Sequence, residues 1–266
     1  MFIVDSHVHL WAGGTPSPAH RQVPSFTAEE LLAEMDAAGV DAAVIQPPAW
    51  DVTSNEVAVD AARRYPTRFA ILGSIPLEKP LDFARIVGWK MRPGMLGFRF
   101  TFSEPRQRSW PTDRTLEKLC SAAARACLPV ALACANFLPV VGRLAQRFPD
   151  LKLIVDHLGA PLRSRDEAAF SNLPQLLALA KYPNIAVKAS SAPGYSSDPY
   201  PFRSIEPYLR AVYDAFGAER MFWGTDITRM SCSYQQCVTQ FAEELPWLSE
   251  RDRELVMGRA LCRWIG

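Results

Sequence analysis

The stretch "PVALACANFLPVVGRLAQRFPDLKLIVDH" (129–157) contains the pattern of a strand, a helix and a second strand. Its apolar runs 129–134 and 151–156 are continuous rather than alternating, which is typical of strands covered on both faces of a parallel sheet. Between them, residues 138–149 carry apolar side chains near helical spacing. Two strands separated by one helix predict a right-handed βαβ unit.

The same alternation extends along the whole chain. We expect six further strands at 2–6, 42–46, 69–74, 95–100, 184–189 and 220–225. Further helices are expected at 27–39, 53–66, 112–127, 204–217 and 249–266. Long loops follow strands at 11–26, 101–111 and 189–203. Eight such units favour an α/β fold, a closed (β/α)8 TIM barrel with a C-terminal helix, over an open sheet. Without a linker or a composition break, we expect one domain over residues 1–266.

Three helix starts carry capping signals. Thr27 is followed three residues later by Glu30, and Thr53 by Glu56, which are the pairs that form capping boxes. Ser249 is the expected N-cap of the last helix.

Composition limits the classes of partner. The chain has 48% hydrophobic residues and a net charge of +1, which argues against a nucleic acid or a membrane surface as partner. It has no secretory signal pattern and no apolar run near the ~20 residues of a membrane span. Six scattered cysteines form no C-x-x-C pair and are expected to be reduced. We expect a cytoplasmic protein that binds a small molecule, and the sequence allows a homo-oligomer.

The rare polar residues gather at the predicted strand ends. His7 and His9 end the first strand and, two residues apart, point to the same side. The other members of this set are Asp156 and His157 after the sixth strand, Asp226 after the eighth, and Arg99 and Lys188 near the ends of the fourth and seventh. In a TIM barrel these ends face one site. Each residue alone is as compatible with a structural role, such as a cap, an ion pair or a core position, as with a functional one. The set as a whole predicts an active site. His20, in a Pro-rich loop, is expected to be solvated, with a substrate contact as the alternative.

Three motifs carry a family resemblance. H-V-H after the first strand, D-H-L-G after the sixth and G-T-D after the eighth resemble the amidohydrolase superfamily. The stretches "VDSHVHLW", "VDHLGAP" and "WGTDI" are similar to its amidohydrolase-related branch. That branch includes 2-pyrone-4,6-dicarboxylate lactonases, sugar lactonases, sulfomuconolactone hydrolases and aromatic-acid decarboxylases.

The chain departs from this family at the fifth strand. Most metal-dependent members have a histidine there, whereas "LPVALACANFLP" offers Cys134 or Asn136. The resemblance therefore implies an incomplete metal site. We expect no obligatory cofactor, while a single Zn²⁺ held by His7, His9 and Asp226 stays compatible with the sequence, because catalytic zinc accepts three protein ligands.

The resemblance and the residues together predict a hydrolase that opens a small, anionic lactone by attack of water. Asp226 is the expected general base, and His7, His9 and His157 are expected to polarise the carbonyl. Arg99, Lys188 and Arg229 are expected to bind the substrate, with Arg203 as a further cation near the mouth. Seven loop aromatics can form an apolar wall, while ordinary loop packing is the expected role of most of them: Trp11, Trp50, Phe102, Trp110, Tyr195, Tyr200 and Phe202. The alternatives are a zinc-dependent decarboxylase or hydratase of an aromatic or unsaturated acid, and a barrel that only binds its ligand.

Overall fold

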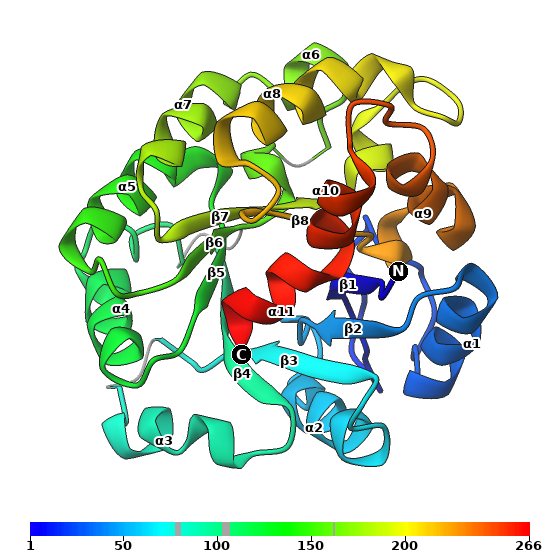
Figure 1. The fold of residues 1–266 in the computed structure, drawn as a ribbon. Coiled ribbons are helices and arrows are strands. Elements are labelled where there is room, and N and C mark those ends of the chain that lie inside the picture. Colours follow the sequence, from blue (N-terminus) through cyan, green and yellow to red (C-terminus); the bar gives the residue numbers. More distant parts are fainter. Residues whose placement is uncertain (78–80, 103–106, 162) are drawn as a thin grey trace.

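Eight parallel strands form a nearly closed barrel in the computed structural model, which describes residues 1–77, 81–102, 107–161 and 163–266 (Figure 1). The strands are β1 (Val4–Val8), β2 (Ala42–Ile45), β3 (Phe69–Gly73), β4 (Met95–Thr101), β5 (Val130–Ala133), β6 (Leu153–Val155), β7 (Ile185–Ser190) and β8 (Met221–Gly224). Each strand pairs with the next one in sequence. The predicted (β/α)8 barrel is confirmed, and so are its eight strands, with small shifts at their ends. Part of the predicted loop 101–111 lies outside the described residues.

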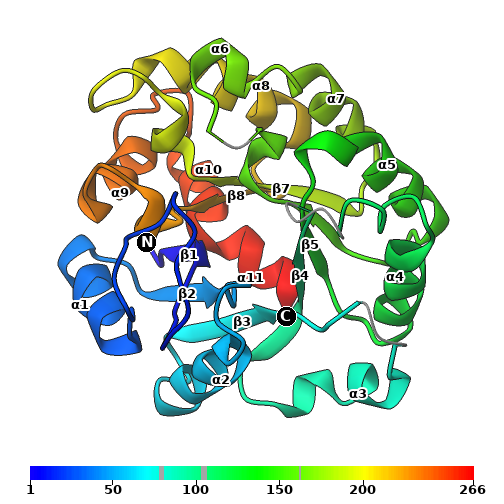
Figure 2. The same cartoon turned by 180° about the vertical axis from the view of Figure 1, so that it is seen from behind.

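Helices surround the barrel on its outer side (Figure 2). They are α1 (Ala28–Ala38), α2 (Ser54–Arg64), α3 (Phe83–Val87), α4 (Thr115–Arg125), α5 (Leu138–Arg147), α6 (Asp166–Ala169), α7 (Leu173–Leu177), α8 (Glu206–Phe216), α9 (Tyr234–Ala242), α10 (Glu250–Glu254) and α11 (Ala260–Ile265). Within the described residues, no helix is long and apolar enough to cross a membrane.

The capping predictions have different outcomes. The Thr27–Glu30 capping box at α1 is confirmed, and Ser249 caps α10. The box predicted at Thr53 is wrong. The backbone of Thr53 is already helical (φ −95°, ψ 0°), and its hydroxyl donates to Asp51 Oδ1 at 2.6 Å instead of accepting from the helix.

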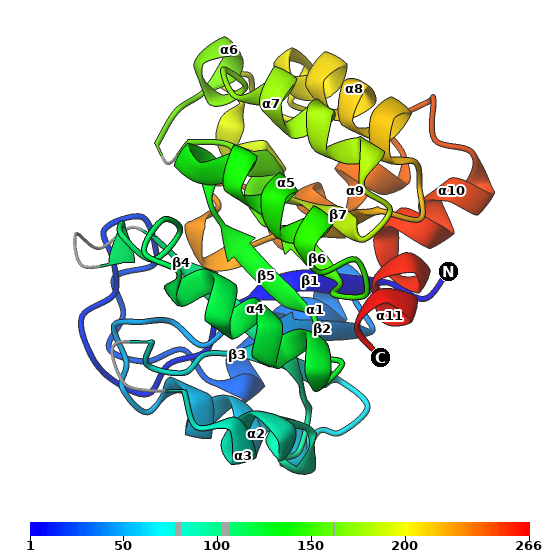
Figure 3. The same cartoon turned by 90° about the vertical axis from the view of Figure 1, so that its left-hand side faces the viewer.

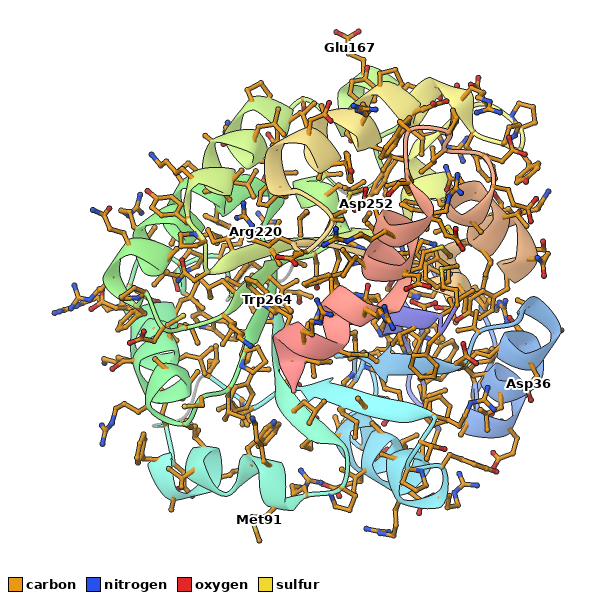
Figure 4. All side chains as sticks on the ribbon, viewed as in Figure 1. Asp36, Met91, Glu167, Arg220, Asp252 and Trp264 are labelled. Carbon is orange, nitrogen blue, oxygen red and sulfur yellow. The ribbon has the colours of Figure 1, made fainter. Side chains whose placement is uncertain are left out.

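The predicted last helix is interrupted. A π-helical turn, Leu255–Arg259, separates α10 from α11, so that α11 crosses the end of the barrel (Figure 1). Gly258 permits this path, because a Cβ atom there would lie 2.5 Å from the carbonyl oxygen of Phe2. Trp264 of α11 then packs on Phe222 of β8, with ring centroids 5.9 Å apart, and covers this end of the barrel (Figure 4).

The Asp5 side chain closes the barrel between β8 and β1. No strand ladder joins these two strands in the part of the chain that the structure describes. Asp5 Oδ1 accepts from the backbone N–H groups of His7 and Thr225, both at 2.9 Å, and Oδ2 accepts from the hydroxyls of Thr225 and Tyr234. Burial raises the pKa of Asp5 to about 6, while these four hydrogen bonds lower it, so the carboxylate is ionised at neutral pH.

A glycine lets the two strands approach this closely. A Cβ atom at Gly224, the last residue of β8, would lie 2.4 Å from Ser6 Oγ and 3.1 Å from Asp5 Oδ1. The backbone N–H of Asp226 then donates to the carbonyl oxygen of His7 at 2.8 Å. The H-x-H and G-T-D motifs are therefore in direct contact across the closure. The loops that follow the strands lie on the side of the barrel opposite the two chain termini (Figure 3).

Candidate active site

The carboxyl ends of β1, β6 and β8 bring three histidines and one carboxylate together. His7 Nε2 lies 3.3 Å from His9 Nε2, and the ring centroids of His7 and His157 are 4.4 Å apart. Asp226 lies beside them, with Oδ1 at 3.4 Å from His9 Nε2 and Oδ2 at 3.9 Å from His157 Nε2. All four side chains are buried. These four residues, which lie far apart in the sequence, therefore form one cluster.

Sharp backbone turns hold three residues of the site. His157, Ser191 and Asp226 each follow a strand and have positive φ values of 55°, 60° and 52°. This left-handed conformation costs a non-glycine residue about 1–3 kcal/mol, and it persists where the surrounding structure imposes it. Such residues concentrate at functional sites. The strain supports an active site at the ends of β6, β7 and β8.

His20 belongs to this cluster, and the expectation that it is solvated is wrong. Its side chain is 8% exposed, and Nδ1 lies 4.0 Å from Asp226 Oδ1. Nδ1 also lies 2.8 Å from Thr228 Oγ1, and the ring packs on Trp50 with centroids 4.7 Å apart. The loop 11–26 folds back over the barrel mouth, and a Pro-rich composition by itself could not indicate this path.

Asp226 is held as a carboxylate. Burial would raise its pKa, but His9, the Arg229 guanidinium, His20 and His157 hold the pKa well below the usual value. Oδ2 accepts hydrogen bonds from Ser191 Oγ and Arg229, both at 3.2 Å. Oδ1 is buried and accepts no hydrogen bond from any residue that the structure describes. The two oxygens of Asp226 therefore have different surroundings.

The histidines of the site are neutral at pH 7. Burial lowers the pKa of His9 to about 3 and that of His157 to about 3. Burial and the nearby cations also hold the pKa of His7 well below its usual value. Each ring then carries one N–H and one lone pair, so the protonated nitrogen decides what each ring can do.

For His9 the structure decides this question. His9 Nδ1 lies 2.5 Å from the backbone carbonyl oxygen of Gln46. Because a carbonyl oxygen can only accept, Nδ1 carries the proton and Nε2 presents its lone pair to Asp226 Oδ1. Neutral His9 therefore cannot donate a hydrogen bond to a substrate carbonyl from Nε2, which corrects the role predicted for it. The lone pair can bind a cation or accept a proton from water.

A second buried carboxylate, Asp156, lies behind His7. Lys188 Nζ lies 3.1 Å from Asp156 Oδ1, and Arg99 Nε donates to Oδ2 at 2.9 Å. Burial would raise the pKa of Asp156, but these two cations lower it to about 2. His7 Nδ1 is 3.9 Å from Asp156 Oδ2. No described residue makes a hydrogen bond to His7 Nδ1, so no contact holds the proton of His7 on that nitrogen.

Arg99 and Lys188 differ in their access to a ligand. The Lys188 side chain is 0% exposed and lies against Asp156, so direct contact with a substrate does not fit its position. Arg99 is 12% exposed and uses Nε for Asp156. Within the described residues, no acceptor holds its two terminal nitrogens. Arg99 can therefore still bind an anion.

The two cations expected after β7 and β8 lie in different places. Arg229 is 12% exposed and bonds to Asp226 Oδ2. It also contacts Tyr195, whose pKa burial raises to about 12. Arg203, by contrast, is 52% exposed and pairs with Glu206 and Glu244. Arg203 is a surface residue, and it does not join the site.

Two of the loop aromatics border the cluster. Trp50 packs on His9 and His20, with centroids 5.9 and 4.7 Å away, and Trp11 meets the edge of Trp50 at 5.6 Å. Of the other five, Phe102 packs against Phe137, Tyr200 against Phe202, and Trp110 lies in the core. Tyr195 packs against Phe170 and contacts Arg229. An apolar wall beside the histidines is therefore built mainly by Trp50 and Trp11.

The donor set of the site suits a metal ion. Among the described residues, two groups have ligand atoms that all lie within 4.8 Å of one another inside the group. They are His7–His157–Asp226 and His9–His20–Asp226. Neutral imidazoles and one carboxylate are donors typical of Zn²⁺ sites. The unpaired Asp226 Oδ1 opposite the lone pair of His9 fits a cation between them. Cys134, at the end of β5, is buried and belongs to neither group, and burial raises the pKa of its thiol.

Several polar partners of the site were not predicted from the sequence motifs. The backbone carbonyl of Gln46 contacts His9, and the hydroxyls of Ser190 and Ser191 contact His157. Ser191 also donates to Asp226, and the Thr228 hydroxyl contacts His20. Ser190 and Ser191 follow Lys188 at the end of β7, and this position was the one available signal. Backbone carbonyls such as that of Gln46 leave no trace in residue type.

Known proteins resemble this chain over most of its length. The profile of the family described as amidohydrolase matches residues 4–260. The L-fucono-1,5-lactonase of Burkholderia ambifaria is 27% identical over 235 residues, 85% of this chain and 80% of that protein. The 4-sulfomuconolactone hydrolase of Hydrogenophaga intermedia is 26% identical over 231 residues, 84% of this chain and 73% of that protein. The structure of an amidohydrolase from Burkholderia multivorans with bound zinc has a TM-score of 0.84 at 21% identity, covering 100% of this chain and 99% of that one.

Proposed function

Because the chain belongs to the amidohydrolase family, we propose that it is a hydrolase that opens a small, anionic lactone by attack of water on the ring carbonyl. The observation that carries this proposal is the buried Asp226 carboxylate among neutral histidines at the barrel mouth. Two curated relatives that hydrolyse lactones, as their names state, support the choice of a cyclic ester. Cytoplasmic location and a homo-oligomeric state stay predictions.

In the proposed reaction Asp226 accepts a proton from the attacking water. Its low pKa makes it a weak base but keeps it ionised at neutral pH. The proton then moves to the ring oxygen as the C–O bond breaks, which yields a hydroxy acid. The lone pair on His9 Nε2, 3.4 Å from Asp226 Oδ1, lies where it can hold the same water.

His157 and His7 are the proposed donors to the developing oxyanion. Ser190 Oγ lies 2.9 Å from His157 Nδ1, and a hydroxyl that donates there leaves the proton of His157 on Nε2. An N–H in a preorganised site stabilises an oxyanion by about 3–4 kcal/mol. Lys188 contributes indirectly, because it holds Asp156 in place behind His7.

A single Zn²⁺ would be held by Asp226 with the imidazoles beside it, His7 and His9 among them, and would supply polarisation of the carbonyl and a more acidic water. In this proposal the hydrolysis does not require the ion.

A screen of lactones tests the proposal. Neutral and carboxylate-bearing lactones are mixed with purified protein and a pH indicator, with and without a chelator, because each ring opened releases one proton. We expect at least one small anionic lactone to be opened. If no lactone is opened by the metal-loaded protein while an aromatic or unsaturated acid loses CO₂, the zinc-dependent decarboxylase is correct instead. Full activity after chelation would exclude that alternative.

Arg99→Met is expected to weaken the binding of anionic lactones. A hydrogen bond to a charged group contributes about 1.5–3 kcal/mol, so KM should rise about 10- to 100-fold for a lactone with a carboxylate and change little for a neutral one. Arg99→Lys, which keeps the charge, should recover part of the loss. Arg210→Met, an exposed arginine paired with Asp214, is the matched control. Equal losses for charged and neutral lactones would contradict anion binding by Arg99.

A further inference from the structure

One carboxylate oxygen of Asp226 lacks a hydrogen-bond donor, and the proposed hydrolysis does not explain this. Oδ2 accepts from Ser191 and Arg229, whereas Oδ1 is buried and accepts from no described residue. Two imidazole nitrogens face Oδ1, His9 Nε2 at 3.4 Å and His20 Nδ1 at 4.0 Å. Burying a carboxylate oxygen without a donor raises the free energy of the folded state, so we expect a positively charged partner on this side of Asp226.

His9 is not that partner, because it makes no hydrogen bond to Oδ1 although its Nε2 lies 3.4 Å away. Its proton is on Nδ1, bound to the carbonyl oxygen of Gln46, and its Nε2 lone pair faces Oδ1. Two electron-rich atoms 3.4 Å apart in a buried place repel each other. A cation between them turns both into ligands, and the Gln46 contact then orients the His9 ring, as outer hydrogen bonds do for metal-bound histidines.

His20 is held beside the same oxygen by the tertiary structure. Its Nδ1 contacts Thr228 Oγ1 at 2.8 Å, and the neighbouring backbone N–H of Arg21 donates to the Thr228 carbonyl oxygen at 2.8 Å. Trp50 packs on its ring. Two contacts of the ring and one of the neighbouring backbone thus fix the imidazole of His20 over Asp226.

We propose that His20 is a metal ligand, and that with His9 and Asp226 it holds a divalent transition-metal ion such as Zn²⁺. Ligand atoms of these three residues lie within 4.8 Å of one another. His20 thereby supplies the nitrogen that the end of β5, with Cys134 and Asn136, does not provide. Two imidazoles and one carboxylate favour zinc or a similar metal over Mg²⁺ or Ca²⁺, which prefer oxygen ligands.

This assignment separates the histidines by the oxygen of Asp226 that they face. His9 and His20 lie on the Oδ1 side of Asp226 with the ion, and His157 lies on the Oδ2 side, where it can still face a substrate carbonyl. The inference concerns metal binding and does not depend on which substrate the protein hydrolyses.

The test measures metal binding directly. Wild-type protein, His20→Ala and Thr228→Val are titrated with Zn²⁺ in competition with a chromophoric chelator, and the visible spectrum of each is recorded with Co²⁺. His20→Ala should weaken Zn²⁺ binding about 10- to 100-fold or more, since even outer contacts of a metal site have effects of this size. Its Co²⁺ spectrum should change as well. Thr228→Val keeps the imidazole and removes only one contact that orients it, so it should weaken Zn²⁺ binding less than His20→Ala does.

Two results would overturn the inference. One is equal Zn²⁺ affinity and an unchanged Co²⁺ spectrum in His20→Ala, and the other is a wild-type protein that takes no Zn²⁺ from the chelator. Far-ultraviolet circular dichroism of each variant verifies that a loss of binding does not come from unfolding. Lactone opening by a protein that binds no Zn²⁺ would leave the proposed function standing and remove only the role of His20.

Discussion

Replacing Asp226 by asparagine is expected to lower kcat for the lactone found in the screen by about 10²- to 10⁴-fold, the usual contribution of a general base. Asparagine keeps the shape of the side chain and can still accept from Ser191 and Arg229. It cannot take a proton from water, so the loss should fall on kcat more than on KM. Initial rates over a range of lactone concentrations, with metal both added and removed, separate the two parameters.

A surface carboxylate provides the matched control for this substitution. Asp214→Asn makes the same chemical change on α8, where the side chain is 53% exposed and paired with Arg210. It should leave kcat unchanged. If Asp226→Asn also kept kcat within a few-fold of wild type, Asp226 would not be the base, and His9, with its free lone pair, would become the next candidate.

Replacing Asp5 by alanine is expected to lower the free energy of unfolding by about 4 kcal/mol, because each buried donor left without an acceptor costs about 1–3 kcal/mol. Four donors lose their acceptor together: the backbone N–H groups of His7 and Thr225 and the hydroxyls of Thr225 and Tyr234. These contacts replace a strand ladder between β8 and β1, so the barrel should open first at this seam. Urea unfolding followed by tryptophan fluorescence measures the change.

Two further variants separate the cause of that loss. Asp5→Asn keeps an oxygen for the two backbone N–H groups and should lose less stability than Asp5→Ala. Asp60→Asn removes a carboxylate that is 52% exposed and pairs with Arg64 within α2, and should change the free energy of unfolding by less than about 0.5 kcal/mol. A loss in Asp5→Ala no larger than that of Asp60→Asn would show that Asp5 does not close the barrel.

Much of the site could be predicted because, in a parallel barrel, residues at the ends of the strands lie together at one face. His7 and His9 point to one side because strand side chains alternate, and the ends of β1, β6 and β8 meet at one face of any closed parallel barrel. Local rules worked where the contact is local, as at the Thr27–Glu30 capping box. They did not work at Thr53, where Asp51 binds the hydroxyl.

The sequence by itself determined the barrel and the group of His7, His9, His157 and Asp226, because hydrophobic patterning and strand-end position are properties of short stretches. Only the tertiary structure decided which nitrogen of His9 carries the proton, that Lys188 lies behind Asp156, and that His20 lies over Asp226. Each of these depends on contacts between segments distant in sequence, such as His20 with Thr228, and on burial that residue type alone does not determine.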